Sequence, residues 1–129
     1  MSEHGADATV SLAGVVLDAP DPAVLADFYR QLLGWRVTSS DDDWVVLTPP
    51  GGGPTLAFQR EPHYRPPSWP SRPDRQQMMI HLDLKVRDLD AAHRRAVTLG
   101  AAPAEWQPQP TDEVRVFTDP VGHVFCLFV

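Results

Sequence analysis

The chain contains an internal repeat, and this repeat constrains its fold more than any other feature. The first half contains Gly14-Val-Val-Leu-Asp-Ala-Pro-Asp21, and the second contains His81-Leu-Asp-Leu-Lys-Val-Arg-Asp88. Each stretch is followed by an amphipathic segment that ends in Leu-Gly, at Gly34 in the first half and at Gly100 in the second. Equivalent positions can therefore be compared within one chain, and the comparison aligns His81 with Gly14.

Hydrophobic periodicity predicts the same order of elements in both halves, a strand and a helix followed by three strands. Alternating apolar residues indicate strands, and apolar residues three to four positions apart indicate helices. Asp21 and Asp88 are suitable N-caps, and glycine suits the left-handed residue that ends a helix. We expect helices at 22–33 and 89–99, and strands at 12–18, 35–38, 44–48, 55–60, 81–86, 101–105, 114–118 and 123–129.

The repeat also predicts the domain organisation. With 129 residues, the chain fits a single domain that buries roughly two-thirds of its unfolded surface. We expect an N-terminal tail at 1–11 and one domain at 12–129, made of module one (12–60) and module two (78–129). The intervening segment 61–77 contains five prolines, which exclude a central strand. Its aromatic residues indicate an ordered flap, and this name is used for residues 61–77 below.

Composition excludes several classes of function. The net charge is −6 and no helix or stripe gathers basic residues, which argues against a nucleic-acid surface. Arg60, Arg65, Arg72 and Arg75 cluster around the flap, where they form either a solvated loop or a site for a carboxylate-bearing ligand. No apolar run is long enough to span a membrane, and the N-terminus lacks the apolar core of a signal peptide. Cys126, the only cysteine, cannot form an internal disulfide, which favours the cytoplasm. A single lysine beside ten arginines is typical of a GC-rich bacterial genome.

The glycine-rich run at residues 51–54 has two interpretations. Phosphate-binding loops are rich in glycine, but they continue into Lys-Ser or Lys-Thr, and this run ends in Pro54. Because it lies between two predicted strands, we interpret it as a hairpin turn.

Specific motifs identify a family resemblance. These are Asp21-Pro22 through Leu33-Gly34-Trp35, then His81-Leu82-Asp83-Leu84, then Asp119-Pro120-Val121-Gly122-His123. With the two-module pattern, they resemble the vicinal-oxygen-chelate superfamily, which includes glyoxalase I, extradiol dioxygenases and bleomycin-resistance proteins. The stretch from Pro66 to Gln77 is similar to a glyoxalase-like subgroup common in actinobacteria. The resemblance implies an α+β fold in which two βαβββ modules form a cupped mixed sheet around a pocket, with the helices on the outer face.

The resemblance also implies where a metal would bind. Enzymes of the superfamily use four strand positions, which correspond here to Gly14, Ala57 (or Leu56, one residue away), His81 and Cys126. Only His81 is an ordinary ligand, and a zinc or iron site needs at least three donors. We therefore expect no cofactor and no family metal centre. A divalent metal stays possible if other residues complete a site around His81, namely Asp83, Glu61, His63 or His123.

Strand alternation predicts the lining of the pocket, because every second side chain faces the same side. The predicted ligand-binding residues are Trp44, Gln59, His63, Tyr64, Trp69, His81, Asp83 and Cys126. His81 and Asp83 are also candidates for catalysis, since an imidazole beside a carboxylate can act as an acid–base couple. The alternative is that His81 is only a hydrogen-bonded pocket residue, and that Cys126 is a small buried hydrophobe.

Two functions remain open. The first is a binding protein that holds an aromatic or amphipathic small organic compound without a metal. The second is a lyase, isomerase or dioxygenase that acts through His81, with an atypical metal site or the acid–base pair. A role in protein assembly is a third possibility, but the sequence shows no exposed apolar stripe for it. Chains of this superfamily with two modules commonly pair, so we expect a homodimer.

Overall fold

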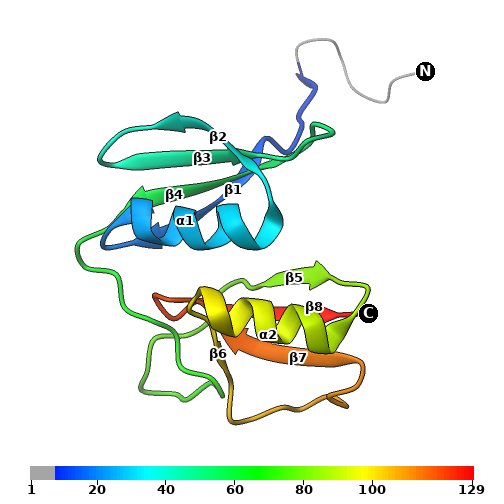
Figure 1. Cartoon of the computed structure of the whole chain (residues 1–129). Helices are drawn as coiled ribbons and strands as arrows, with labels where there is room; N and C mark the ends of the chain where they lie inside the picture. Colours follow the sequence, from blue (N-terminus) through cyan, green and yellow to red (C-terminus); the bar gives the residue numbers. More distant parts are fainter. Residues whose placement is uncertain (1–7) are drawn as a thin grey trace.

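The computed structural model describes residues 8–129 and contains both predicted modules (Figure 1). Module one comprises β1 (Gly14–Ala19), α1 (Pro22–Leu33), β2 (Arg36–Ser40), β3 (Trp44–Thr48) and β4 (Thr55–Arg60). Module two comprises β5 (Leu82–Lys85), α2 (Leu89–Leu99), β6 (Ala102–Pro103), β7 (Val114–Thr118) and β8 (Val124–Phe128). The first seven residues of the expected tail lie outside the described residues. The predicted α+β fold of two βαβββ modules is confirmed.

Most predicted boundaries agree with the structure to within two residues, and β6 is the strand that is shortened most. Both helices and the strands β3, β4 and β7 have the predicted bounds, and β1 begins at Gly14 rather than Leu12. The strand expected at 101–105 is reduced to two residues, Ala102 and Pro103. Proline has no backbone N–H to donate to a ladder, so Pro103 limits this edge strand.

Each module forms its own four-stranded sheet, and the two sheets have the same strand order. The order is β1-β4-β3-β2 in module one and β5-β8-β7-β6 in module two. The first strand of each module pairs in parallel with its last strand, and the other pairs are antiparallel. The register places Val16 opposite Ala57 in module one and Asp83 opposite Cys126 in module two. The structure therefore preserves the internal repeat at the level of individual residue pairs.

Local sequence explains where both helices begin and end. The Asp21 side chain accepts a hydrogen bond from the Ala23 N–H, and Pro22 occupies the first turn, where its missing N–H costs nothing. Asp88 caps α2 in the same way. Both helices end at a left-handed glycine, with φ of 71° at Gly34 and 118° at Gly100. No helix in the described part of the chain is long and apolar enough to cross a membrane.

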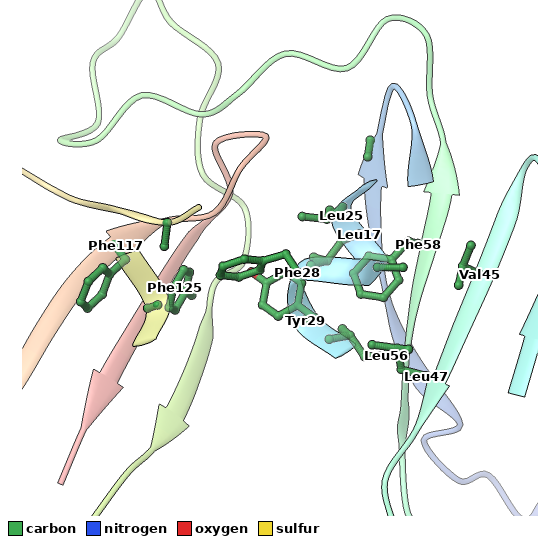
Figure 2. Packing of buried hydrophobic residues seen from close by; sticks show 14 of the residues in the cluster. Leu17, Leu25, Phe28, Tyr29, Val45, Leu47, Leu56, Phe58, Phe117 and Phe125 are labelled. Carbon is green, nitrogen blue, oxygen red and sulfur yellow. The ribbon is translucent and has the colours of Figure 1, made fainter. Parts of the chain in front are cut away.

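One hydrophobic core joins the two modules, and aromatic side chains form its centre (Figure 2). Tyr29 from α1 stacks on Phe58 of β4, with ring centroids 5.7 Å apart. Its neighbour Phe28 reaches the other module and lies 5.9 Å from Phe125 of β8. Helix α1 therefore packs against both sheets, and burial of these rings holds the modules in a fixed relation.

The flap follows module one and packs against module two. Within the flap, the Ser68 N–H donates to the Gln76 carbonyl at 2.9 Å, which closes a loop. Pro66 lies directly against Gly122, where a Cβ would come within 2.6 Å of the proline Cβ. Trp69 packs on the apolar face of module two and donates its indole N–H to the Trp106 carbonyl at 3.1 Å. These contacts fix the flap over one sheet and leave a cavity beside it.

Candidate ligand cavity and a His-Asp-Cys cluster

A buried polar network holds the modules together near the candidate site. Asp119, only 4% exposed, accepts hydrogen bonds from the Tyr29 hydroxyl at 2.7 Å and from the backbone N–H groups of Val121 and His123. Burial raises the pKa of Asp119, while the Tyr29 hydrogen bond and the His123 charge act in the opposite direction. The network fixes the turn 119–123 against α1, and this turn positions His123.

A cavity of about 370 Å³ lies between β1 and the flap. On β1, Val16 and Asp18 line the cavity and alternate with Leu17 and Ala19, which belong to the common core beneath α1, although Leu17 also borders the cavity. The cavity therefore opens on the face of the sheet opposite α1. Its volume is within the range of small-molecule sites.

Part of the cavity lining is apolar. Val16 is 44% exposed, and Met79 and Ile80, which precede β5, are 87% and 57% exposed. All three residues line the cavity. Large apolar side chains at this exposure are suited to contact with the apolar part of a ligand.

Other lining residues are polar and contain unused hydrogen-bonding groups. The Tyr64 hydroxyl is buried and has no hydrogen-bond partner among residues 8–129. Burial raises the pKa of Tyr64 above its usual value, so the phenol stays protonated and can donate. Within the same residues, the side chains of Arg65 and His63 also make no hydrogen bond or ion pair. A buried donor without a partner costs free energy, so the Tyr64 hydroxyl suits a hydrogen bond to an acceptor group of a ligand.

His123 orients Tyr64 within the cavity. The two rings lie 4.8 Å apart, and His123 Nε2 is 2.7 Å from the Asp18 carbonyl oxygen. A carbonyl only accepts, so Nε2 must donate this hydrogen bond. The bond connects module two to the end of β1 and fixes one edge of the cavity.

A second cluster of chemically active side chains lies on module two. Asp83 is on β5 opposite Cys126 on β8, and His81 comes directly before β5. His81 Nε2 is 3.0 Å from the Asp83 carboxylate, and the candidate ligand atoms of His81, Asp83 and Cys126 all lie within 4.8 Å of one another. The alternation of side chains along β5 explains why His81 and Asp83 share one face.

Cys126 forms a small apolar cluster with Val116 and Val124, and Trp69 packs against this cluster. Burial, together with the charge of Asp83 and a hydrogen bond to it, raises the pKa of Cys126 to about 11. The thiol therefore stays protonated at neutral pH unless a cation replaces its proton.

The predicted site residues separate into three groups. His81, Asp83 and Cys126 come together, with Trp69 beside them. His63 and Tyr64 line the cavity. Trp44 and Gln59 are paired on β3 and β4, and the Gln59 amide donates to the Asp18 carboxylate at 3.1 Å.

Sequence reasoning did not place Met79 and Ile80 in the lining of the cavity. Their signal was visible as two adjacent large apolar residues just before a predicted strand. Only the tertiary structure shows that both remain exposed beside β1.

The four-strand metal site of the superfamily does not fit this chain. The strands β1 and β4 pair in the same register as β5 and β8, so Ala57 is the counterpart of Cys126. In module one, neither Ala57 nor Gly14 has a side-chain donor atom for a metal. A Cβ at Gly14 would lie 2.8 Å from the Thr55 carbonyl oxygen, so this position has no room for a ligating side chain. A metal bound here would need other residues, and His81, Asp83 and Cys126 are the ones the structure brings together.

Comparison with known proteins agrees with the fold. A family model described as a glyoxalase-like domain matches residues 14–128. A glyoxalase/bleomycin resistance/dioxygenase family enzyme from Burkholderia phytofirmans has a TM-score of 0.68 at 16% identity, covering 92% of this chain and 97% of its own. A domain of the same description from Frankia has a TM-score of 0.63 at 19% identity, covering 95% and 98%.

A third similar structure was solved with ligands. It is a point mutant of the fosfomycin resistance protein FosX from Listeria monocytogenes, in complex with Mn(II) and 1S,2S-dihydroxypropylphosphonic acid. Its TM-score is 0.68 at 14% identity, covering 93% of this chain and 90% of its own. A comparison with curated protein sequences found no match. Because the family model spans nearly all of the two-module fold, the chain belongs to the family of glyoxalase-like domains, and the solved glyoxalase/bleomycin resistance/dioxygenase structures share its fold.

Proposed function

We propose that this protein binds a small amphipathic organic compound in the cavity between β1 and the flap. The observation behind this proposal is the buried, unpartnered hydroxyl of Tyr64 at a cavity that apolar side chains also line. Such a cavity suits a ligand with an apolar or aromatic body and an acceptor group at one end. The phosphonic acid in the FosX structure is a small ligand with acceptor oxygens, which agrees with this class.

Arg65 favours an acceptor group that is negatively charged. It lines the cavity close to Tyr64 in the sequence and is not engaged in an ion pair within residues 8–129. Glu61 also lines the cavity, but its carboxylate accepts a hydrogen bond from the His63 N–H. A carboxylate, sulfonate or phosphonate could accept from both the Tyr64 phenol and the Arg65 guanidinium.

The aromatic sulfonate dye ANS (8-anilinonaphthalene-1-sulfonate) tests this proposal, because its fluorescence increases in an apolar site. Tyr64→Phe and Arg65→Ala should each weaken dye binding about threefold or more, since each removes a donor to the sulfonate. Arg95→Ala is the matched control, because Arg95 is exposed on α2 and away from the cavity, and it should bind the dye like the parent. Equal binding by the parent and all three variants would contradict the proposal.

A second candidate function is catalysis through His81. The observation that favours it is the 3.0 Å contact between His81 and Asp83, which is the geometry of an acid–base couple. The lyase, isomerase and dioxygenase activities expected from the sequence all belong here. Conversion of a bound compound that stops in His81→Ala, while dye binding in the cavity persists, would favour an enzyme over a binding protein.

A further inference from the structure

A second cavity, also of about 370 Å³, lies within the flap and is lined by flap residues alone. Arg65, Pro67 and Gln76 line both this flap cavity and the cavity beside β1, so the two cavities adjoin there. The other residues that line the flap cavity are Pro66, Ser68, Asp74 and Arg75. A ligand that extends past Arg65 would therefore pass from a partly apolar space into a polar one.

Hydrogen bonds fix the backbone around the flap cavity. The Ser68 N–H donates to the Gln76 carbonyl, which joins the two sides of the cavity. The Gln77 side-chain amide donates to the carbonyl oxygens of Arg72 and Arg75, and its distance to the Arg75 oxygen is 3.2 Å. The turn that carries Arg75 is thus held by a flap side chain, so its backbone is in place before a ligand binds.

Two arginines line the flap cavity without a protein partner. Within residues 8–129, the side chains of Arg65 and Arg75 make no hydrogen bond or ion pair, although the Asp74 carboxylate lines the same cavity. Three arginines and two acidic residues make the flap net positive, in a chain whose net charge is −6. Unpaired guanidinium groups on a fixed backbone favour an anion, because they bind carboxylate and phosphate oxygens with paired hydrogen bonds.

We propose that the flap cavity is a second anion-binding position, and that the ligand of this protein carries two neighbouring anionic groups on an apolar body. The first anionic group binds Tyr64 and Arg65, and the second lies beyond Arg65 and binds Arg75. Carboxylates, phosphates and sulfonates all have the required acceptor oxygens. This inference rests on the proposed function, because the apolar body occupies the cavity beside β1.

Two fluorescent compounds, dansyl-glutamate and dansyl-glutamine, test the second position. They have the same apolar dansyl ring and almost the same shape, but dansyl-glutamate has a second carboxylate where dansyl-glutamine has a neutral amide. Dansyl fluorescence increases in an apolar site, so titration gives the Kd of each compound. We expect the parent to bind dansyl-glutamate about threefold or more tightly than dansyl-glutamine, since an exposed ion pair contributes about that much.

Variants of the flap identify the group that causes this preference. Arg75→Ala should bind the two compounds equally, because the second carboxylate loses its partner. Asp74→Asn should increase the preference for dansyl-glutamate, because it removes a negative charge from the same cavity. Arg72→Ala is the matched control, an exposed flap arginine that lines neither cavity, and it should keep the preference of the parent.

The outcomes separate this inference from the proposed function. Equal binding of the two compounds by the parent, or a preference that persists in Arg75→Ala, would overturn the second anion position. If both compounds then still bind more weakly to Tyr64→Phe, the proposed function stands alone. A preference that depends on Arg75 but not on Arg72 supports the second position, even where Tyr64→Phe binds both compounds like the parent and the proposed role of Tyr64 fails.

Discussion

At the scale of single residues, Asp119 is the one buried carboxylate among residues 8–129. Its carboxylate is buried and accepts three hydrogen bonds, one from Tyr29 in the other module and two from its own turn. Charged groups are rarely buried without such partners, because desolvation costs several kcal/mol. The motif Asp119-Pro120-Val121-Gly122-His123 thus has a structural role in joining the modules.

Asp119 leads to a prediction about pH. Its pKa in the folded protein is raised above the unfolded value of about 3.9, so the folded state holds the proton more tightly. Its contribution to stability is therefore present at low pH and is lost as pH rises through the folded-state pKa. Asp119→Asn has no proton to lose, so its free energy of unfolding should rise relative to the parent as pH increases above the unfolded-state pKa of about 3.9.

Urea unfolding at several pH values measures this difference. A constant offset between variant and parent is expected from the altered hydrogen bonds, and only the change of the offset with pH tests the prediction. An offset that stays constant or moves the other way would show that Asp119 is not desolvated as the structure indicates.

At the scale of elements, the parallel pairs β1–β4 and β5–β8 decide where the functional side chains lie. In module two, the register places Asp83 directly beside Cys126. In module one, the same register brings the backbone of Thr55 against Gly14. One kind of strand pair thus supports a polar cluster in one module and a close backbone approach in the other.

Gly14→Ala tests this close approach. The new methyl would lie 2.8 Å from the Thr55 carbonyl oxygen and still closer to the Thr55 hydroxyl, so β1 and β4 must separate locally. We expect the free energy of unfolding to fall by about 1–3 kcal/mol, as for other overpacked sites. Gly51→Ala is the matched control, because a Cβ there meets nothing within 4 Å, and it should change stability by about 0.5 kcal/mol or less. Equal stabilities of the two variants in urea unfolding would be inconsistent with the tight strand pair.

At the scale of the whole molecule, α1 in the core and His123 beside the cavity connect the two modules. Phe28 and Tyr29 join the two sheets within the core, and His123 joins them beside the cavity. The cavity thus depends on both modules, because Val16 comes from one and His123 from the other.

We propose that the chain forms a homodimer, as the family resemblance led us to expect. All five residues of the edge strand β2 are exposed, and an uncovered edge strand is usually protected by pairing or by another chain. Sedimentation equilibrium at micromolar concentration should give about twice the chain mass of 14.3 kDa. A mass near that of one chain across this range would exclude the dimer.

The sequence by itself determined the order of elements, the caps of both helices and the duplication of the module. These features depend on neighbouring residues, because periodicity, capping and left-handed glycines act over a few positions. The sequence also placed His81 and Asp83 on one face, since alternation along a strand is local. It was the family resemblance that added Cys126.

Only the tertiary structure decided which candidate residues line the cavity and which lie together around Cys126. Nothing in the local sequence indicates that the flap carries Trp69 onto module two and leaves Tyr64 beside β1 with its hydroxyl unpartnered. The sequence left open whether Leu56 or Ala57 is the counterpart of Cys126. The strand register identifies Ala57. Such contacts join residues far apart in the chain, and their positions depend on the packing of whole elements, which a local pattern does not encode.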